Sequence, residues 1–145
     1  MLVKLIKDEY LLSMTNFNKQ IKYWPESAEK NWQVAQSLFR NKHYDACLFF
    51  VHLSIEKLIK GLVVIETKKP APYIHDLPKL ANLAKLELSQ EKRNHLRIIT
   101  TFNIAGRYAD DKYDFYKKCT KNYTQKNLFM CKEIFLWLKK EYPKK

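Results

Sequence analysis

The chain has 145 residues, of which 46% are hydrophobic and 14% aromatic, a composition typical of one globular domain and not of a disordered segment. Its two glycines and five prolines are too few for the many turns of a sandwich or barrel, so we expect long helices joined by few loops. The formal net charge of +12 indicates a polyanionic partner such as RNA, DNA, a nucleotide or an acidic protein, or else a set of solvated lysine-rich helix faces.

The first segment, residues 2–21, is predicted to form a marginal helix. Its apolar side chains recur at loosely helical spacing, at Leu2, Leu5, Ile6, Leu12 and Phe17. Charged residues interrupt this run, so it resembles neither a signal peptide nor a membrane span, and we expect a soluble cytoplasmic protein without membrane contact. The helix either packs across the main bundle or joins a partner.

A helical hairpin is predicted next. Its first helix begins near Pro25, which suits a first helical position, and its inward face contains Ala28, Trp32, Ala35 and Phe39. Its second helix, residues 45–66, is apolar around most of its circumference, which is typical of a helix at the centre of a bundle or in a dimer interface. The short polar break between the two helices predicts that they run antiparallel.

The remaining helices are predicted from their caps. Residues 67–75 form an extended loop with two prolines, after which Asp76 caps a short helix and Ser89 caps the next. Gly106 is predicted to end that helix as a left-handed cap, and Thr124 to begin the last one. The inward positions of the last two helices are Leu96, Ile99, Phe102, Ile104, Leu128, Cys131, Ile134, Phe135 and Leu138.

The common catalytic and phosphate-binding motifs are absent. The sequence has no G-x-G-x-x-G, P-loop, H-E-x-x-H or G-x-S-x-G, and two glycines cannot build a glycine-rich phosphate cradle. Cys47, Cys119 and Cys131 form no C-x-x-C pair, so we expect buried free thiols in a reducing compartment, with neither metal nor cofactor.

Two polar groups stand out on this background. His52, Glu56 and Lys60 share one stripe of the apolar central helix, with Lys57 beside them. One interpretation is a snorkelling lysine paired with the glutamate and a hydrogen-bonded histidine, and the other is a polar stripe that faces a shared cleft. His75, just before the capping Asp76, is free to approach another segment.

The second group lies in the stretch NIAGRYADDKYDFY, residues 103–116. Arg107 is followed there by Tyr108 and by Asp110, Asp111 and Asp114. The composition favours a local salt-bridged turn, and the alternative is a phosphate-reading arginine beside stacking tyrosines. Residues 117–145 add nine lysines against two glutamates, a basic segment that would attract a polyanion without sequence specificity.

The order of FFVHLSIEKLIKGLVV, a proline-bearing loop, HDLPKL and GRYADD resembles the HEPN domain family over roughly residues 23–142. This resemblance implies an all-α, up-and-down antiparallel bundle of four to five main helices that commonly dimerises, preceded here by an N-terminal extension over residues 1–22. Many HEPN proteins accompany a minimal nucleotidyltransferase in two-gene, toxin–antitoxin-like systems. Others are RNases.

HEPN RNases contain an arginine and a downstream histidine separated by four to six residues, and this chain departs from that pattern. Arg40 and Arg93 are followed too closely by His43 and His95, and no histidine follows Arg97 or Arg107. Because histidine is the usual proton-transfer group at neutral pH, we expect a binding module and not an enzyme.

The resemblance implies a nucleotide- or RNA-binding homodimer, joined through the central hairpin and partnered with a nucleotidyltransferase. Arg107 would read phosphate, Tyr108 would stack, and His75, Lys57 and Lys60 would rim the cleft. The supporting polar residues would be His52, Glu56, Asp76, Asp110 and Asp111. The alternatives are an RNase toxin that uses Arg107 with His75 or His52, and a purely structural dimerisation adaptor.

Overall fold

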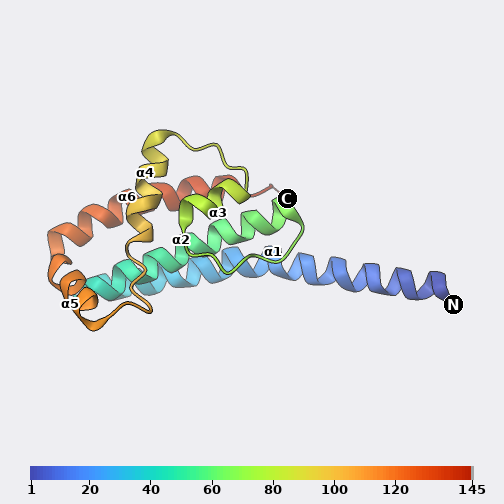
Figure 1. Cartoon of the computed structure of the whole chain (residues 1–145), viewed down its shortest axis with the longest axis horizontal. Helices are drawn as coiled ribbons and strands as arrows, with labels where there is room; N and C mark the ends of the chain where they lie inside the picture. The colour runs from blue at the N-terminus through green and yellow to red at the C-terminus, as the bar shows by residue number, and fades with distance from the viewer. Residues whose placement is uncertain (145) are drawn as a thin grey trace.

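The computed structural model describes residues 1–144, and these form a bundle of six α-helices without any β-strand (Figure 1). In chain order the helices are α1 (Leu2–Arg40), α2 (Tyr44–Thr67), α3 (Leu77–Leu83), α4 (Gln90–Thr100), α5 (Ala109–Lys118) and α6 (Lys121–Lys140). The expected all-α bundle is confirmed. No helix within residues 1–144 combines the length and the apolar character that crossing a bilayer requires.

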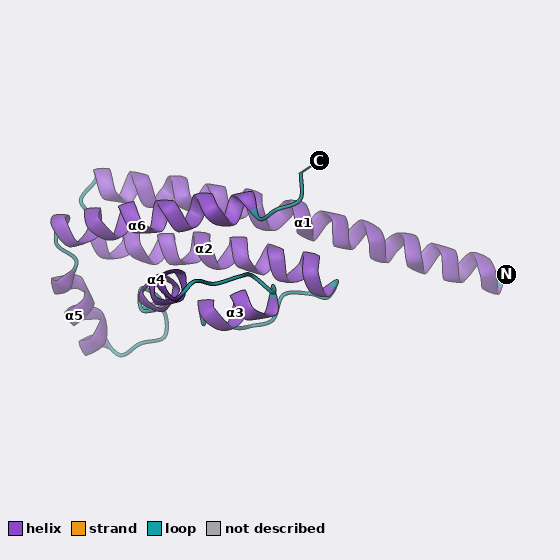
Figure 2. Cartoon of the chain, turned by 90° about the horizontal axis from the view of Figure 1, so that it is seen from above, coloured by secondary structure: helices purple, strands orange, loops and turns teal. Residues whose placement is uncertain are grey.

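Helix α2 is the centre of the bundle. It runs antiparallel to α1, and α1 and α6 lie on one side of it while α3 and α4 lie on the other (Figure 2). Most of its residues from Cys47 to Val64 are buried, including polar His52, Ser54 and Glu56. Of the two positions predicted for this apolar helix, the structure therefore gives it the bundle centre, because neighbours from the same chain cover its circumference.

The boundary predicted before Pro25 is wrong, because α1 is one helix of 39 residues that contains Pro25. A proline inside a helix removes one backbone hydrogen bond. Packing of the residues that follow Pro25 maintains the helix. Ala28 and Trp32 are buried, and the Trp32 ring stacks on Phe135 of α6 at a centroid distance of 4.6 Å. The segment before Pro25 is helical, as predicted, but its first half projects beyond the bundle (Figure 1).

The caps of α3 and α4 are those predicted. The Asp76 carboxylate accepts a hydrogen bond from the backbone N–H of Lys79, and the Ser89 hydroxyl accepts one from the N–H of Lys92, each at 3.1 Å. Each cap satisfies one of the N–H groups that have no partner within the helix. Each of these two short helices therefore begins where its own sequence specifies. In the bundle, α4 packs against α3.

The region after α4 differs from the prediction. Helix α4 ends at Thr100, six residues before Gly106, and Gly106 lies within the following loop with φ of +79°. Residues after this loop form α5, which the sequence did not predict, and Asp110 and Asp111 fall in its first turn, where carboxylates favour the helix dipole. Because only Phe115 of α5 is buried, the alternating aspartates and tyrosines show no apolar face from which this helix could be predicted.

The last helix begins at Lys121, not at Thr124. The hydroxyl of Thr120 caps it by accepting a hydrogen bond from the N–H of Tyr123 at 3.2 Å, while Thr124 is fully buried inside the helix. The inward positions Cys131, Ile134, Phe135 and Leu138 are buried as predicted. The predicted start at Thr124 is therefore wrong by three residues, and the cap is the earlier threonine, Thr120.

Candidate functional site

Glu56, on the buried centre of α2, joins three basic side chains. Its Oε1 atom lies 2.7 Å from Nδ1 of His75 and 3.8 Å from Nε2 of His52. Its Oε2 atom lies 3.4 Å from Nζ of Lys60. Because a carboxylate inside a protein needs partners to offset its lost hydration, these contacts explain how Glu56 is accommodated in an apolar helix.

His52 is the innermost member of this network and is fully buried. Burial lowers its pKa below the usual histidine value, an effect that the nearby Glu56 carboxylate partly opposes. Its Nε2 atom is 3.5 Å from the backbone oxygen of His75, and its Nδ1 atom has no hydrogen-bond partner within residues 1–144. His52 is therefore a structural side chain that helps to hold the α2–α3 loop.

Lys60 and Lys57 have different surroundings, although they lie one turn apart. Lys60 is buried, and its Nζ lies 5.9 Å from the ring centre of Trp24 as well as beside Glu56. Lys57 instead donates a hydrogen bond of 2.7 Å to the hydroxyl of Ser27 on α1. The stripe predicted to rim a cleft is thus divided, and His52, Glu56, Lys60 and His75 form an internal network without Lys57.

The cysteines provide no reactive group. All three are free thiols inside the bundle, and burial raises the pKa of both Cys47 and Cys119 to about 12, and that of Cys131 as well. Thiols with raised pKa values are poor nucleophiles and poor metal ligands at neutral pH. Residues 1–144 contain no cluster of three or more His, Cys, Asp or Glu side chains that could hold a metal ion.

Arg107 lies in the exposed α4–α5 loop and is held by the backbone. Its Nη2 donates a hydrogen bond of 2.9 Å to the carbonyl oxygen of Thr101. In the described part of the chain Arg107 forms no ion pair with an aspartate, and Asp114 pairs instead with Lys117 at 3.8 Å. The salt-bridged turn favoured by composition is therefore not formed, and most of the guanidinium donors face solvent.

Tyr108 is next to Arg107 and is 85% exposed, at the N-cap position of α5. Arg107 also lines an open hollow of about 240 Å³ together with Thr101, Asp111, Asp114, Phe115 and Lys118. The positive charges of Arg107 and Lys118 in this hollow are balanced by the negative charges of Asp111 and Asp114. The hollow thus contains an arginine oriented by the backbone, and the next residue in the chain, Tyr108, has an exposed ring.

A second hollow, which the sequence did not predict, lies between α3 and α4. Arg93 and Arg97 line it from α4, and Asp76, Pro78, Lys79 and Asn82 from the α3 side, around a volume of about 310 Å³. Three cations against one carboxylate leave it positive. A signal was present in the sequence: two of only four arginines lie four residues apart, which places both on one face of a helix.

The two hollows adjoin the C-terminal end of α4, since Thr101 lines the hollow of Arg107 and Thr100 lines the hollow of Arg93 and Arg97. We call the basic residues that line them the arginine surface: Lys79, Arg93, Arg97, Arg107 and Lys118. Of the residues predicted for the site, only Asp76 and Asp111 line these hollows together with Arg107. Neither hollow is lined by His75, Lys57 or Lys60, so the single cleft expected from these residues and Arg107 stays a prediction.

Comparison with known proteins identifies the family. A family model described as "HEPN domain" matches residues 21–142. The crystal structure of TT1696 from Thermus thermophilus shares the fold, with a TM-score of 0.69 and 18% identity over 85% of this chain and 98% of that chain. A search of curated proteins found no match. Because the matched residues span most of the chain and the bundle is all-helical, this protein belongs to the HEPN domain family.

Proposed function

We propose that this chain is a non-catalytic HEPN module that binds single-stranded RNA through the arginine surface. The observation that carries this proposal is that three of the four arginines line two adjoining hollows, although the chain is overwhelmingly lysine-rich. The arginine fork matches phosphate geometry better than the lysine ammonium does. Membership of the HEPN family, whose domains serve nucleotide- and RNA-related functions, supports the same ligand class.

The form of the site favours an extended strand over a small nucleotide. Both hollows are open to solvent, and Tyr108, which follows Arg107 in the chain, has an exposed ring. Proteins that bind single strands combine a basic groove for phosphates with aromatic rings on which bases stack. Arg93 and Arg97 would contact phosphates, while Arg107 would contact one more phosphate and Tyr108 one base.

The histidine contacts support binding without catalysis. An RNase that used Arg107 with His75 or His52 would need one of these imidazoles free beside the scissile phosphate. His52 is fully buried, and His75, whose Nδ1 atom lies 2.7 Å from Glu56, lines neither of the hollows that contain arginines. We therefore propose that the chain works with a catalytic partner, a minimal nucleotidyltransferase, in the cytoplasm, where its three free cysteines stay reduced.

RNA binding is tested by fluorescence anisotropy with a labelled single-stranded RNA over a series of salt concentrations. The double variant Arg93→Ala/Arg97→Ala should bind about tenfold more weakly, and the slope of log K against log salt should fall by about 1.4, since each lost phosphate contact removes about 0.7. The conservative variant Arg93→Lys/Arg97→Lys should retain the salt slope but lose part of the affinity, because charge is kept while the fork is lost.

The matched control is Lys19→Ala/Lys30→Ala, which removes the same charge from exposed positions of α1, on the other side of α2 from α4 (Figure 2). It should leave both affinity and slope nearly unchanged. Equal losses in the two double variants would mean that only net charge matters, and the arginine surface would be rejected. Degradation of the labelled RNA that Arg107→Ala abolishes would reject the non-catalytic role.

A further inference from the structure

The first half of α1 is an apolar helix with nothing packed on it. Residues 1–16 are all exposed, and this segment, which we call the arm, projects from the bundle past the end of α2 (Figures 1 and 2). Val3, Ile6 and Tyr10 are 67%, 58% and 64% exposed. A short helix in water is marginally stable unless its apolar face is covered.

One face of the arm has a coiled-coil spacing of mostly apolar residues, while Leu2, Leu5, Leu11 and Leu12 lie off this face. Positions 3, 6, 10, 13, 17, 20 and 24 alternate steps of three and four residues, and they are occupied by Val3, Ile6, Tyr10, Ser13, Phe17, Gln20 and Trp24. The same face continues into Ala28 and Ala35, which are buried against the rest of the bundle. The arm therefore extends a face that packs on helices in one half of α1 and is uncovered in the other half.

Charge indicates what covers the arm. The whole chain has a net charge of +12, but the side chains of residues 1–18 sum to zero, with Lys4 and Lys7 against Asp8 and Glu9. A neutral arm has no electrostatic attraction for nucleic acid or for an anionic membrane. Because its side chains carry no net charge, two copies of the arm can meet without like-charge repulsion.

We propose that the arm pairs with the arm of a second copy of this chain, antiparallel and around a two-fold axis. The basic residues precede the acidic ones, so an antiparallel pair can place Lys4 and Lys7 of one copy beside Asp8 and Glu9 of the other, whereas a parallel pair would align like charges. Identical apolar faces are self-complementary in such an isologous contact. The antiparallel direction also places the two bulky bundles at opposite ends of the pair.

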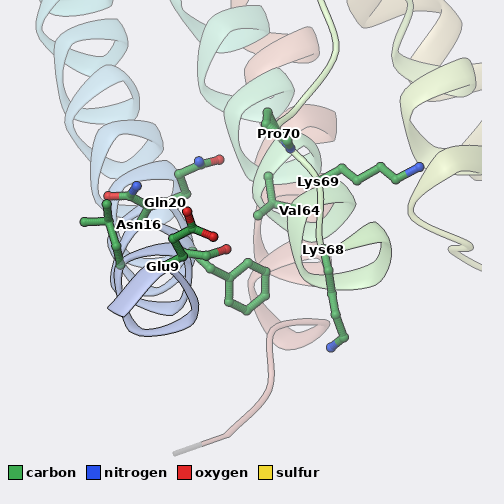
Figure 3. Close-up of a pocket in the computed structure, with 10 residues that line it drawn as sticks. Glu9, Asn16, Gln20, Val64, Lys68, Lys69 and Pro70 are labelled. Carbon is green, nitrogen blue, oxygen red and sulfur yellow. The ribbon is translucent and has the colours of Figure 1, made fainter. Parts of the chain in front are cut away.

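A groove at the base of the arm completes the interface. Where α2 ends, Leu12 and Phe17 of α1 face Val64, Lys68 and Pro70 across a cavity of about 380 Å³ (Figure 3). In the antiparallel register that pairs Lys4 with Glu9, the tip of the second arm, Met1 and Leu2, reaches the level of Leu12. The groove would then receive the apolar tip, and the arm pair would be continuous with the core of each bundle.

Sedimentation velocity of the full chain over the micromolar range tests this pairing. We expect a species of twice 17.4 kDa that Ile6→Glu or Tyr10→Glu reduces to the monomer. The matched control is Leu11→Glu, because Leu11 is 60% exposed, like Ile6 at 58%, but lies away from the coiled-coil face. Since these side chains touch nothing in the bundle, thermal unfolding of the bundle should be unchanged in all three variants.

Cross-linking determines the direction of the pair. Under mild oxidation Ile6→Cys should form a covalent dimer with high yield, because residue 6 lies near the two-fold axis. Ser13→Cys, on the same coiled-coil face but far from the axis, should not. Efficient cross-linking at both positions would indicate a parallel pair and overturn the antiparallel geometry. A monomer at every concentration, a dimer that persists in Ile6→Glu, or an arm that binds lipid vesicles in place of a second arm would overturn the proposal itself.

Discussion

Oε1 of Glu56 lies 2.7 Å from Nδ1 of His75, which connects the buried centre of α2 to a loop residue 19 positions later. His75 immediately precedes Asp76, the residue that caps α3 and lines the hollow containing Arg93 and Arg97. The contact therefore fixes the α2–α3 loop beside the arginine surface. In this protein the buried polar network has a positioning role, and the arginines that we propose as RNA contacts lie outside it.

Replacing Glu56 should destabilise the fold strongly. Glu56→Ala leaves the buried Lys60 ammonium without its carboxylate, so the free energy of unfolding should fall by about 3 kcal/mol, as measured by urea denaturation. Glu66→Ala is the control, because it removes a surface ion pair with Lys85 and should cost less than about 1 kcal/mol. Similar losses in both variants would show that the Glu56 network does not stabilise the core.

The stability of the protein should decrease in mild acid through His52. Burial lowers the pKa of His52 in the folded state. At pH values below the ordinary histidine pKa of 6.5, the unfolded chain therefore binds more protons than the folded chain. As a result, the free energy of unfolding decreases as the pH is lowered. The groups that face His52 are Glu56, His75 and Lys60, and Glu56 moderates this loss. Urea denaturation between pH 7.5 and 5 should show a smaller decrease for His52→Gln than for wild type.

The exposed His43 supplies the control for this pH dependence. His43→Gln should reproduce the wild-type curve, because His43 takes no part in the buried network around Glu56. Parallel curves for wild type and His52→Gln would contradict the role of His52.

Gly61 should tolerate no side chain. A Cβ atom there would overlap the Tyr142 hydroxyl, which donates a hydrogen bond of 2.6 Å to the Leu58 carbonyl oxygen, and would crowd Trp24. Gly61→Ala should lower the free energy of unfolding by about 1–3 kcal/mol despite the better helix propensity of alanine. The double variant Gly61→Ala/Tyr142→Phe should lose less than the sum of the single variants, because the overlapping hydroxyl is absent.

Gly106→Ala separates this steric effect from backbone strain. Nothing lies within 4 Å of a Cβ at Gly106, but its φ of +79° disfavours alanine, so we expect a loss of about 1 kcal/mol. This loss should persist when Tyr142 is replaced by phenylalanine. If Tyr142→Phe also reduced the loss caused by Gly106→Ala, the coupling between positions 61 and 142 would not be local.

Tyr108 should contribute to binding of single-stranded RNA and not of duplex RNA. Its exposed ring can stack on an unpaired base, and such contacts are worth about 1–3 kcal/mol, so Tyr108→Ala should weaken single-strand binding at least fivefold. Duplex RNA presents no free base face and should bind both proteins equally. Tyr23→Ala, at an exposed tyrosine of α1, is the control that should leave both affinities unchanged.

Elements with local signals could be predicted from the sequence. The Asp76 and Ser89 caps, the α1–α2 hairpin and the inward faces of α4 and α6 follow from capping chemistry and helical periodicity, which depend on neighbours a few residues away. The continuity of α1 through Pro25 and the presence of α5 could not be predicted in this way. Both depend on packing: α1 is held by α2 and α6, and α5 is fixed by the single buried ring of Phe115.

The same distinction between local sequence signals and helix packing applies to the candidate site. Composition and spacing alone establish a basic, all-helical chain, with one polar stripe in its most apolar helix and an arginine-tyrosine pair after a glycine. Three further relationships emerge only from the folded bundle: Glu56 joins His75, Lys57 stays outside their network, and the arginines of α4 adjoin Arg107. Each of them connects segments whose separation in space is set by how the helices pack, and no local pattern of residues encodes that packing.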